Sequence, residues 1–101
     1  MNELTEEQRA IVEFAKKGDR LAIDSLSWLI GYEKIDKKYV EIIVEFAKKG
    51  DRLAIDRLYW LIDEEKVDKK YSEISVELAK KGDGQAIYRL YQLIAEEKID
   101  K

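Results

Sequence analysis

Chemically active side chains in this chain are carboxylates and amines, because the sequence contains no His and no Cys. The commonest general base, the thiolate nucleophile and the usual transition-metal ligands are therefore missing. Two acidic clusters, Asp63–Glu65 and Glu96–Glu97, lack the spacing of an EF-hand loop. Catalysis by paired carboxylates needs a cleft that raises the pKa of one of them, and nothing in the sequence marks such a residue. We therefore expect no enzymatic activity, no catalytic residue, no cofactor and no metal site.

Three lysine pairs recur along the chain, at Lys16-Lys17, Lys48-Lys49 and Lys80-Lys81. They are compatible with a ladder for an acidic ligand. The simpler interpretation is that each pair stabilises the end of a helix, where the macrodipole favours cations. Lys and Arg number 19 against 22 Asp and Glu, which gives a net charge of −3. That balance lacks the basic excess of nucleic-acid-binding proteins, so we expect no nucleic-acid partner.

Two tryptophans are candidates for partner recognition. Trp28 and Trp60 occupy equivalent positions in a repeat, and Trp is enriched in binding hot spots. The alternative is that both pack between neighbouring repeats, and the third equivalent position, Gln92, favours it. A polar residue at the last copy is what the exposed end of a stack needs. We predict that both tryptophans are mostly buried between successive repeats.

A second candidate surface comprises Ser25, Gly31 and Tyr32, with Trp28 nearby. The second copy of the repeat carries Arg, Asp and Glu at the first three of these positions. A glycine inside a helix costs about 1 kcal/mol relative to Ala, so Gly31 asks for an explanation. One interpretation is a shallow patch that accepts a side chain of a protein or peptide partner. The other is neutral variation of the surface or adjustment of the first repeat.

All these residues belong to an internal repeat with a period of 32 residues. Residues 11–38 align without a gap with residues 43–70, and 23 of the 28 positions are identical. Residues 43–69 align with residues 75–101, with 19 of 27 identical. We therefore predict one repeat domain over 1–101, made of repeats at about 4–35, 36–67 and 68–101.

Each repeat has the pattern of two amphipathic helices joined by a Gly-Asp turn. In the middle copy, apolar residues recur at helical spacing on both sides of Gly50-Asp51. Gly is suited to a left-handed helix C-cap and Asp to the following N-cap. Thr5 and Gln8 form a capping box, and Asp36 and Asp68 are further N-cap candidates. The sequence predicts six helices, at about 5–17, 19–34, 36–49, 51–66, 68–81 and 83–99.

Differences between the copies predict which sides face outward. The last copy is polar at four positions where the middle copy is apolar, namely Ser72, Ser75, Gln85 and Gln92. The first copy has smaller or charged residues at three positions, namely Glu7, Ala10 and Ser27. We interpret these as outer faces of terminal repeats, which must be polar in an open stack. The sequence therefore predicts an all-α, open α-solenoid of three helix-turn-helix repeats, whose last copy has lost its forward-facing apolar groups.

The repeat resembles the tetratricopeptide-type helical hairpin. The resemblance rests on the Gly-Asp turn followed by Ala22-Ile23, Ala54-Ile55 and Ala86-Ile87. The period is 32 rather than about 34, and the family's W-x2-L-G-x2-Y signature and terminal Pro are absent. No ligand-binding residue of that family is therefore carried over. The near-identity of the copies and their regular capping resemble a de novo designed or consensus-built helical repeat protein; a recently duplicated natural gene is the alternative.

The function that this pattern favours is a structural scaffold, a designed helical repeat without native catalytic function. The alternative is a protein- or peptide-binding module that uses one face of the second helices. No partner is required, and we expect a monomer for which weak self-association is possible. Residues 1–7 lack the basic and apolar runs of a signal peptide, and no apolar stretch approaches the ~20 residues of a membrane span. We expect no membrane partner and a cytoplasmic location, or recombinant expression only.

Overall fold

The computed structural model describes residues 3–96, which are all-helical: six α-helices, two short 3-10 segments and no strand within that range. The elements in chain order are α1 (Glu6–Lys16), α2 (Arg20–Gly31), η1 (Lys37–Tyr39), α3 (Val40–Lys48), α4 (Arg52–Asp63), η2 (Lys69–Ser72), α5 (Glu73–Lys80) and α6 (Gly84–Ala95). The order of long helices agrees with the six that the sequence predicts.

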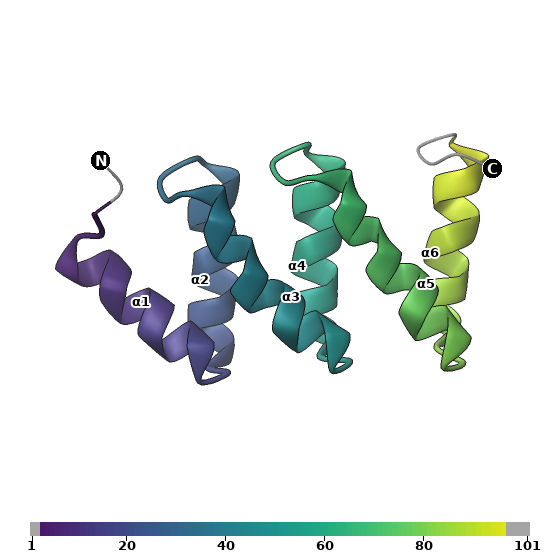
Figure 1. Cartoon of the computed structure of the whole chain (residues 1–101), viewed down its shortest axis with the longest axis horizontal. Coiled ribbons are helices and arrows are strands. Elements are labelled where there is room, and N and C mark those ends of the chain that lie inside the picture. Colours follow the sequence, from purple (N-terminus) through teal and green to yellow (C-terminus); the bar gives the residue numbers. More distant parts are fainter. Residues whose placement is uncertain (1–2, 97–101) are drawn as a thin grey trace. The chain divides into compact units, whose positions relative to one another are not determined.

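The chain divides into two compact units, Met1–Tyr71 and Ser72–Lys101. In the first unit, α1 packs on α2 and α3 packs on α4, so that two helical hairpins form (Figure 1). These hairpins are joined chiefly by α2, which packs along α4. In the second unit, α5 and α6 pack on each other as a third hairpin.

The turn inside each hairpin forms as the sequence predicts. Gly18, Gly50 and Gly82 have φ angles of 91°, 92° and 92°, in the left-handed region that favours glycine. The amide of Asp19 donates to the carbonyl of Phe14 at 3.1 Å, and the amide of Gly18 donates to that of Ala15 at 2.9 Å. This pair of bonds is the Schellman arrangement that satisfies the last carbonyls of a helix.

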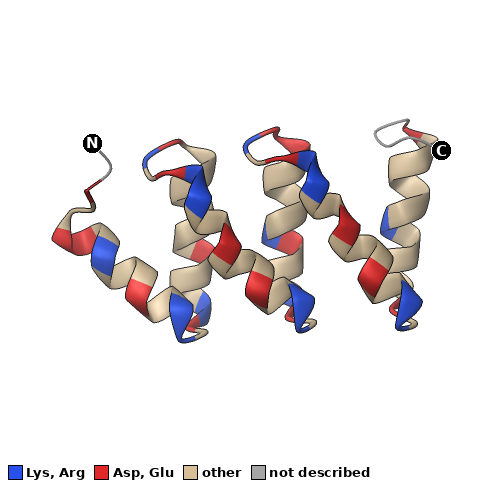
Figure 2. Ribbon diagram, in the orientation of Figure 1, with Lys and Arg blue, Asp and Glu red and all other residues tan. Residues whose placement is uncertain are grey.

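Side chains begin the helices after these turns. The carboxylates of Asp19, Asp51 and Asp83 each accept a hydrogen bond from the backbone amide three residues later, at 2.9–3.0 Å. The predicted capping box before α1 is present, with Thr5 and Gln8 bonded reciprocally at 3.0 Å. Figure 2 shows the lysines at the ends of α1, α3 and α5, where they complement the helix dipoles.

The second helix of each of the first two hairpins ends earlier than predicted. Glu33 and Glu65 have φ angles of 60° and 58°, which stop α2 and α4 without a glycine. Asp36 and Asp68 accept hydrogen bonds from the amides two residues later, at 2.7 Å, and therefore begin 3-10 segments rather than α-helices. The predicted helix at 83–99 is α6 up to Ala95, and positions 97–99 lie outside the described residues.

Buried aliphatic residues run through both units and confirm the predicted helical faces. The interior of the first unit includes side chains with no exposed surface, among them Ile23, Leu26, Ile43, Ile55, Leu58 and Leu61. Three serines that we expected on outer faces, namely Ser27, Ser72 and Ser75, are buried instead. Burial of Ser27 is tolerated because its hydroxyl donates to the carbonyl of Asp24 at 2.6 Å. The prediction that these positions mark the ends of a stack is therefore wrong.

Candidate interaction surface

The contact that joins the first two hairpins is built around a glycine. A Cβ added at Gly31 would lie 2.6 Å from Cζ3 of Trp60 and 3.6 Å from Cδ2 of Leu61. Real Cβ atoms do not approach other atoms so closely, so the indole occupies the space that a side chain at position 31 would need. Gly31 is buried as a result. The glycine that seemed costly within a helix is explained by this close approach of α4 to α2.

A cluster of aromatic and charged groups surrounds that contact. The rings of Trp28 and Trp60 are 4.8 Å apart between centroids and are tilted by 57°, a favourable aromatic geometry. Tyr32 stacks on Trp28 with ring centroids 5.7 Å apart. The guanidinium of Arg57 lies 5.7 Å from the Trp28 ring and pairs with the carboxylate of Asp24. Arg57 thus links α4 to α2 through two interactions at once.

The two tryptophans differ in burial. Trp60 is half-buried and packs on α2, as the packing interpretation predicts. Trp28 is 38% exposed, so it is less buried than Trp60, although its ring contacts Trp60 of the next hairpin. Its position in α2 is equivalent to that of Trp60 in α4, yet among the described residues no helix covers it in the way that α2 covers Trp60.

The predicted patch of Ser25, Gly31, Tyr32 and Trp28 is distributed over different environments. Tyr32 and Trp28 stack on each other and are both exposed. Ser25 is half-buried on the same helix. Gly31 offers no open depression, because Trp60 fills the space above it. The exposed part of the patch that a partner can reach is therefore the Trp28–Tyr32 stack.

Four positions of α2 form what we call the forward stripe: Ile23, Ser27, Ile30 and Gly31. All four are buried; α4 packs on α2, and its Trp60 and Leu61 lie against Gly31. The equivalent positions in α6 are Ile87, Tyr91, Ile94 and Ala95, and all four are exposed. Ile87, Tyr91 and Ile94 are 54%, 65% and 43% exposed, against 0% for Ile23. The forward-facing apolar groups of the last repeat are therefore present, and the prediction that they are lost is wrong.

The exposed apolar surface of the second unit extends beyond this stripe. Tyr88, where α2 and α4 carry Asp24 and Asp56, is also exposed and stacks with Tyr91 at 6.2 Å. Val76 of α5 is exposed, although Val12 and Val44 at the equivalent positions are buried. We call Val76, Ile87, Tyr88, Tyr91 and Ile94 the tail face. Sequence reasoning missed it, although the replacement of Asp by Tyr at position 88 was a visible signal.

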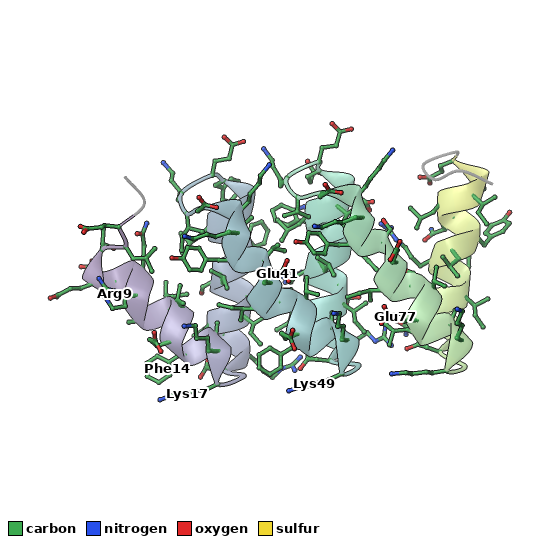
Figure 3. All side chains as sticks on the ribbon, viewed as in Figure 1. Arg9, Phe14, Lys17, Glu41, Lys49 and Glu77 are labelled. Atoms are coloured by element: carbon green, nitrogen blue, oxygen red, sulfur yellow. The ribbon has the colours of Figure 1, made fainter. Side chains whose placement is uncertain are left out.

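The first hairpin exposes a different apolar surface, which we call the head face: Phe14, Leu21 and Trp28. Leu21 is 76% exposed, and Phe14 projects from the end of α1 beside Lys17 (Figure 3). The equivalent residues of the second hairpin, Phe46, Leu53 and Trp60, are all half-buried. Phe46 lies on the turn of the first hairpin, 3.3 Å from a Cβ built on Gly18. The head face is thus the first-repeat version of the surface with which the second hairpin covers the first.

A polar hollow of about 730 Å³ lies where the start of α1 meets the loop after α2. Its lining includes Thr5, Gln8, Lys34 and Asp36. The Gln8 side-chain nitrogen already donates to the Lys34 carbonyl at 2.9 Å, and its oxygen accepts from the Thr5 backbone amide in the capping box. These polar groups are engaged in holding the chain, and the hollow is wide and open to solvent.

A tyrosine joins the 3-10 segment η2 to α3. The hydroxyl of Tyr71 donates to Oε2 of Glu41 at 2.5 Å. This hydrogen bond is the main cause that raises the pKa of Tyr71 to about 12, and burial and the negative charges of Glu41 and Asp68 act in the same direction. Figure 3 shows Glu41 on α3. Tyr71 therefore ties the start of the third repeat to the second hairpin, within the first unit.

Among residues 3–96, no group of three or more carboxylates is arranged to hold a metal ion. Within the same range, no helix combines the length and the apolar character needed to cross a bilayer.

Comparisons with family models, with curated proteins and with solved structures find no match to this chain. The candidate functional surfaces are therefore the head face, the tail face and the Trp28–Tyr32 stack.

Proposed function

We propose that this chain is a structural scaffold: a designed helical repeat protein, without catalytic function, whose three hairpins stack as an open α-solenoid. The observation that carries the proposal is the set of contacts that joins one repeat to the next. In the first unit, residues separated by about one repeat period meet across α2 and α4, as in Gly31 with Trp60 and Asp24 with Arg57. A repeat whose residues contact the neighbouring repeat at a regular spacing acts as a structural building block.

Further ion pairs follow the same spacing. Arg20 pairs with Asp51 at 3.4 Å, and Glu33 pairs with Lys66 at 3.2 Å. Exposed pairs of this kind contribute little free energy each, but they favour one register of the two hairpins over others. The polar residues of the repeat therefore serve capping and repeat-to-repeat alignment, which supports a structural role.

The experiment is the construction of a four-repeat chain by insertion of a second copy of residues 36–67. The first of the two middle copies is followed by a repeat that carries a tryptophan at the position of Trp60. It must leave room for that ring as repeat one does with Ser27 and Gly31, so it carries Tyr59→Ser and Asp63→Gly. We expect helicity to rise in proportion to length and the unfolding midpoint in denaturant to equal or exceed that of the parent, since stability in stacks grows with the number of interfaces.

The matched control is the same four-repeat chain with Tyr59 and Asp63 retained. Its Asp63 would place a Cβ against the next tryptophan, so we expect a lower midpoint than that of the substituted version. A substituted four-repeat chain that unfolds at lower denaturant than the parent, or in separate transitions, would contradict the scaffold proposal.

The second candidate function is a protein- or peptide-binding module that uses one face of the second helices. The exposed Trp28–Tyr32 stack supports it, because such aromatic pairs supply contact area at small entropic cost. A test is selection of peptides from a displayed random library on the parent chain, followed by binding to Tyr32→Ala. Loss of the selected peptides on this variant, with retention on Gln85→Ala as control, is expected if the stack is the binding site. Equal binding to both variants would exclude it.

A further inference from the structure

We infer that the tail face binds the head face of a second copy of this chain, so that copies associate head to tail. The proposal goes beyond the scaffold function, because it concerns contacts between chains. It rests on the equivalence of the repeats. The tail face corresponds to the forward stripe of α2, which is buried within the chain, and α4 is the helix that packs on α2 there.

The first step concerns the tail face. In the first unit, the four residues of the forward stripe of α2 are buried, α4 packs on α2, and Trp60 and Leu61 of α4 lie over Gly31. In α6 the same stripe keeps its aliphatic residues, Ile87 and Ile94, but leaves them exposed. A surface with the composition of a repeat interface therefore lies open on the second unit. Its complement is the side of a hairpin that a following repeat presents.

The second step concerns the head face. The second hairpin covers the first with Phe46 near Gly18 and with Trp60 over Gly31. The first hairpin carries Phe14 and Trp28 at those positions, and both are exposed, as is Leu21. The chain therefore leaves open both halves of its own repeat interface, one on each unit. A second copy supplies the half that each face lacks.

The loss of both members of an ion pair supports a second copy of this chain over a charged partner. Within the chain, Asp24 of one hairpin pairs with Arg57 of the next. At the tail face the acidic member is replaced by Tyr88, and at the head the basic member is replaced by Ser25. Both members of the ion pair are thus removed together, so that no unpaired charge is buried when tail meets head. Solubility of an isolated surface would favour an exposed Asp over an exposed Tyr.

The position at the centre of the contact keeps a small residue in the last repeat. Position 31 is Gly under Trp60, and the equivalent position in α6 is Ala95. Trp28 of a second copy must therefore sit slightly farther out than Trp60 does, which an exposed side chain can accommodate. This difference predicts an association weaker than the packing within the chain, strengthened by Ala95→Gly.

Head-to-tail contacts use two different surfaces, so each added copy leaves one face open, and association continues beyond a dimer unless a ring closes. We expect sedimentation equilibrium of the parent to show a weight-average mass that rises with concentration above 11.9 kDa. A parent that stays monomeric at every concentration would overturn the proposal and leave a different protein or peptide as the occupant of the tail face.

Two variants separate this arrangement from the symmetric alternative of α6 against α6. Tyr91→Glu blocks the tail face, and Leu21→Glu blocks the head face; both residues are mostly exposed, so the fold is expected to persist in circular dichroism. Each variant alone should be monomeric. Their equimolar mixture should form a 1:1 dimer and nothing larger. The intact head face of Tyr91→Glu binds the intact tail face of Leu21→Glu, and both outer faces of that dimer are blocked.

The matched control is Gln85→Glu, which adds the same charge to α6 at an exposed position outside the tail face. It should associate like the parent. Self-association of Leu21→Glu on its own, or a mixture that stays monomeric, would overturn the head-to-tail assignment. Loss of association in Gln85→Glu would overturn the role of the tail face, since it would show a general effect of charge.

Discussion

The indole of Trp60 fills the space directly above the α-carbon of Gly31, so that a Cβ at that position would lie 2.6 Å from Cζ3 of the ring. The two residues are on α4 and α2, the helices through which the first two hairpins join. Gly31 is therefore a requirement of the repeat interface, and not of the backbone of α2, whose conformation there is helical.

This relationship predicts the effect of Gly31→Ala. In an exposed helix the change would stabilise by about 1 kcal/mol through helix propensity. Here the added methyl group overpacks the interface, and we expect a loss of about 1–3 kcal/mol in the free energy of unfolding by urea. The same substitution made together with Trp60→Leu should be less harmful, or even stabilising, because the ring is gone. Equal effects in both backgrounds would contradict the contact.

The two tryptophans should differ in their contribution to stability. Trp60 packs on α2, and we expect Trp60→Ala to cost about 3 kcal/mol in unfolding free energy. Trp28 is more exposed, and we expect Trp28→Ala to cost about 1 kcal/mol or less. Both are measured by urea unfolding at low protein concentration, where contacts between chains do not contribute. A larger loss for Trp28→Ala would reverse the assignment of the packed tryptophan.

Tyr71 should make stability depend on alkaline pH. Its phenol donates to Glu41, and its pKa rises from 10.0 to about 12 in the folded chain. Because the folded state holds the proton more tightly, the stabilisation is complete below pH 10 and is lost as the pH rises towards 12. We expect the difference in unfolding midpoint between the parent and Tyr71→Phe to shrink over that interval. A difference that is constant with pH would show that the hydrogen bond does not stabilise the fold.

Backbone conformation predicts opposite effects of glycine at two helix ends. Glu65 has a φ angle of 58°, in the left-handed region, where a side chain costs on the order of 1 kcal/mol. We therefore expect Glu65→Gly to raise the free energy of unfolding by up to about 1 kcal/mol. Gly50→Ala, at a φ angle of 92°, should lower it by a similar amount. Urea titrations of the two variants check both signs, and a neutral Gly50→Ala would contradict the turn assignment.

The local features of this fold could be predicted because they depend on residues close together in the chain. The Gly-Asp turns, the Thr5–Gln8 box and the helical faces require only a helix period and the chemistry of helix ends. Their prediction is confirmed at Gly18, Gly50 and Gly82 and at the aspartates that follow them. The early ends of α2 and α4 were missed, because a Glu in the left-handed conformation has no mark in the sequence.

Which side of each second helix packs against the next hairpin was decided only by the tertiary structure. Helical spacing shows that Leu21 and Trp28 share one side and that Ile23 and Ile30 share another, but it does not show which side meets the next hairpin. We predicted the first. In the structure Leu21 is 76% exposed, although Trp28 contacts Trp60 and Arg57 of α4, and α4 covers Gly31, which is adjacent to Ile30. Each side is apolar enough to be buried, so hydrophobicity alone does not choose between them. The choice depends on shape, because Gly31, which has no side chain, leaves the space that the Trp60 ring occupies.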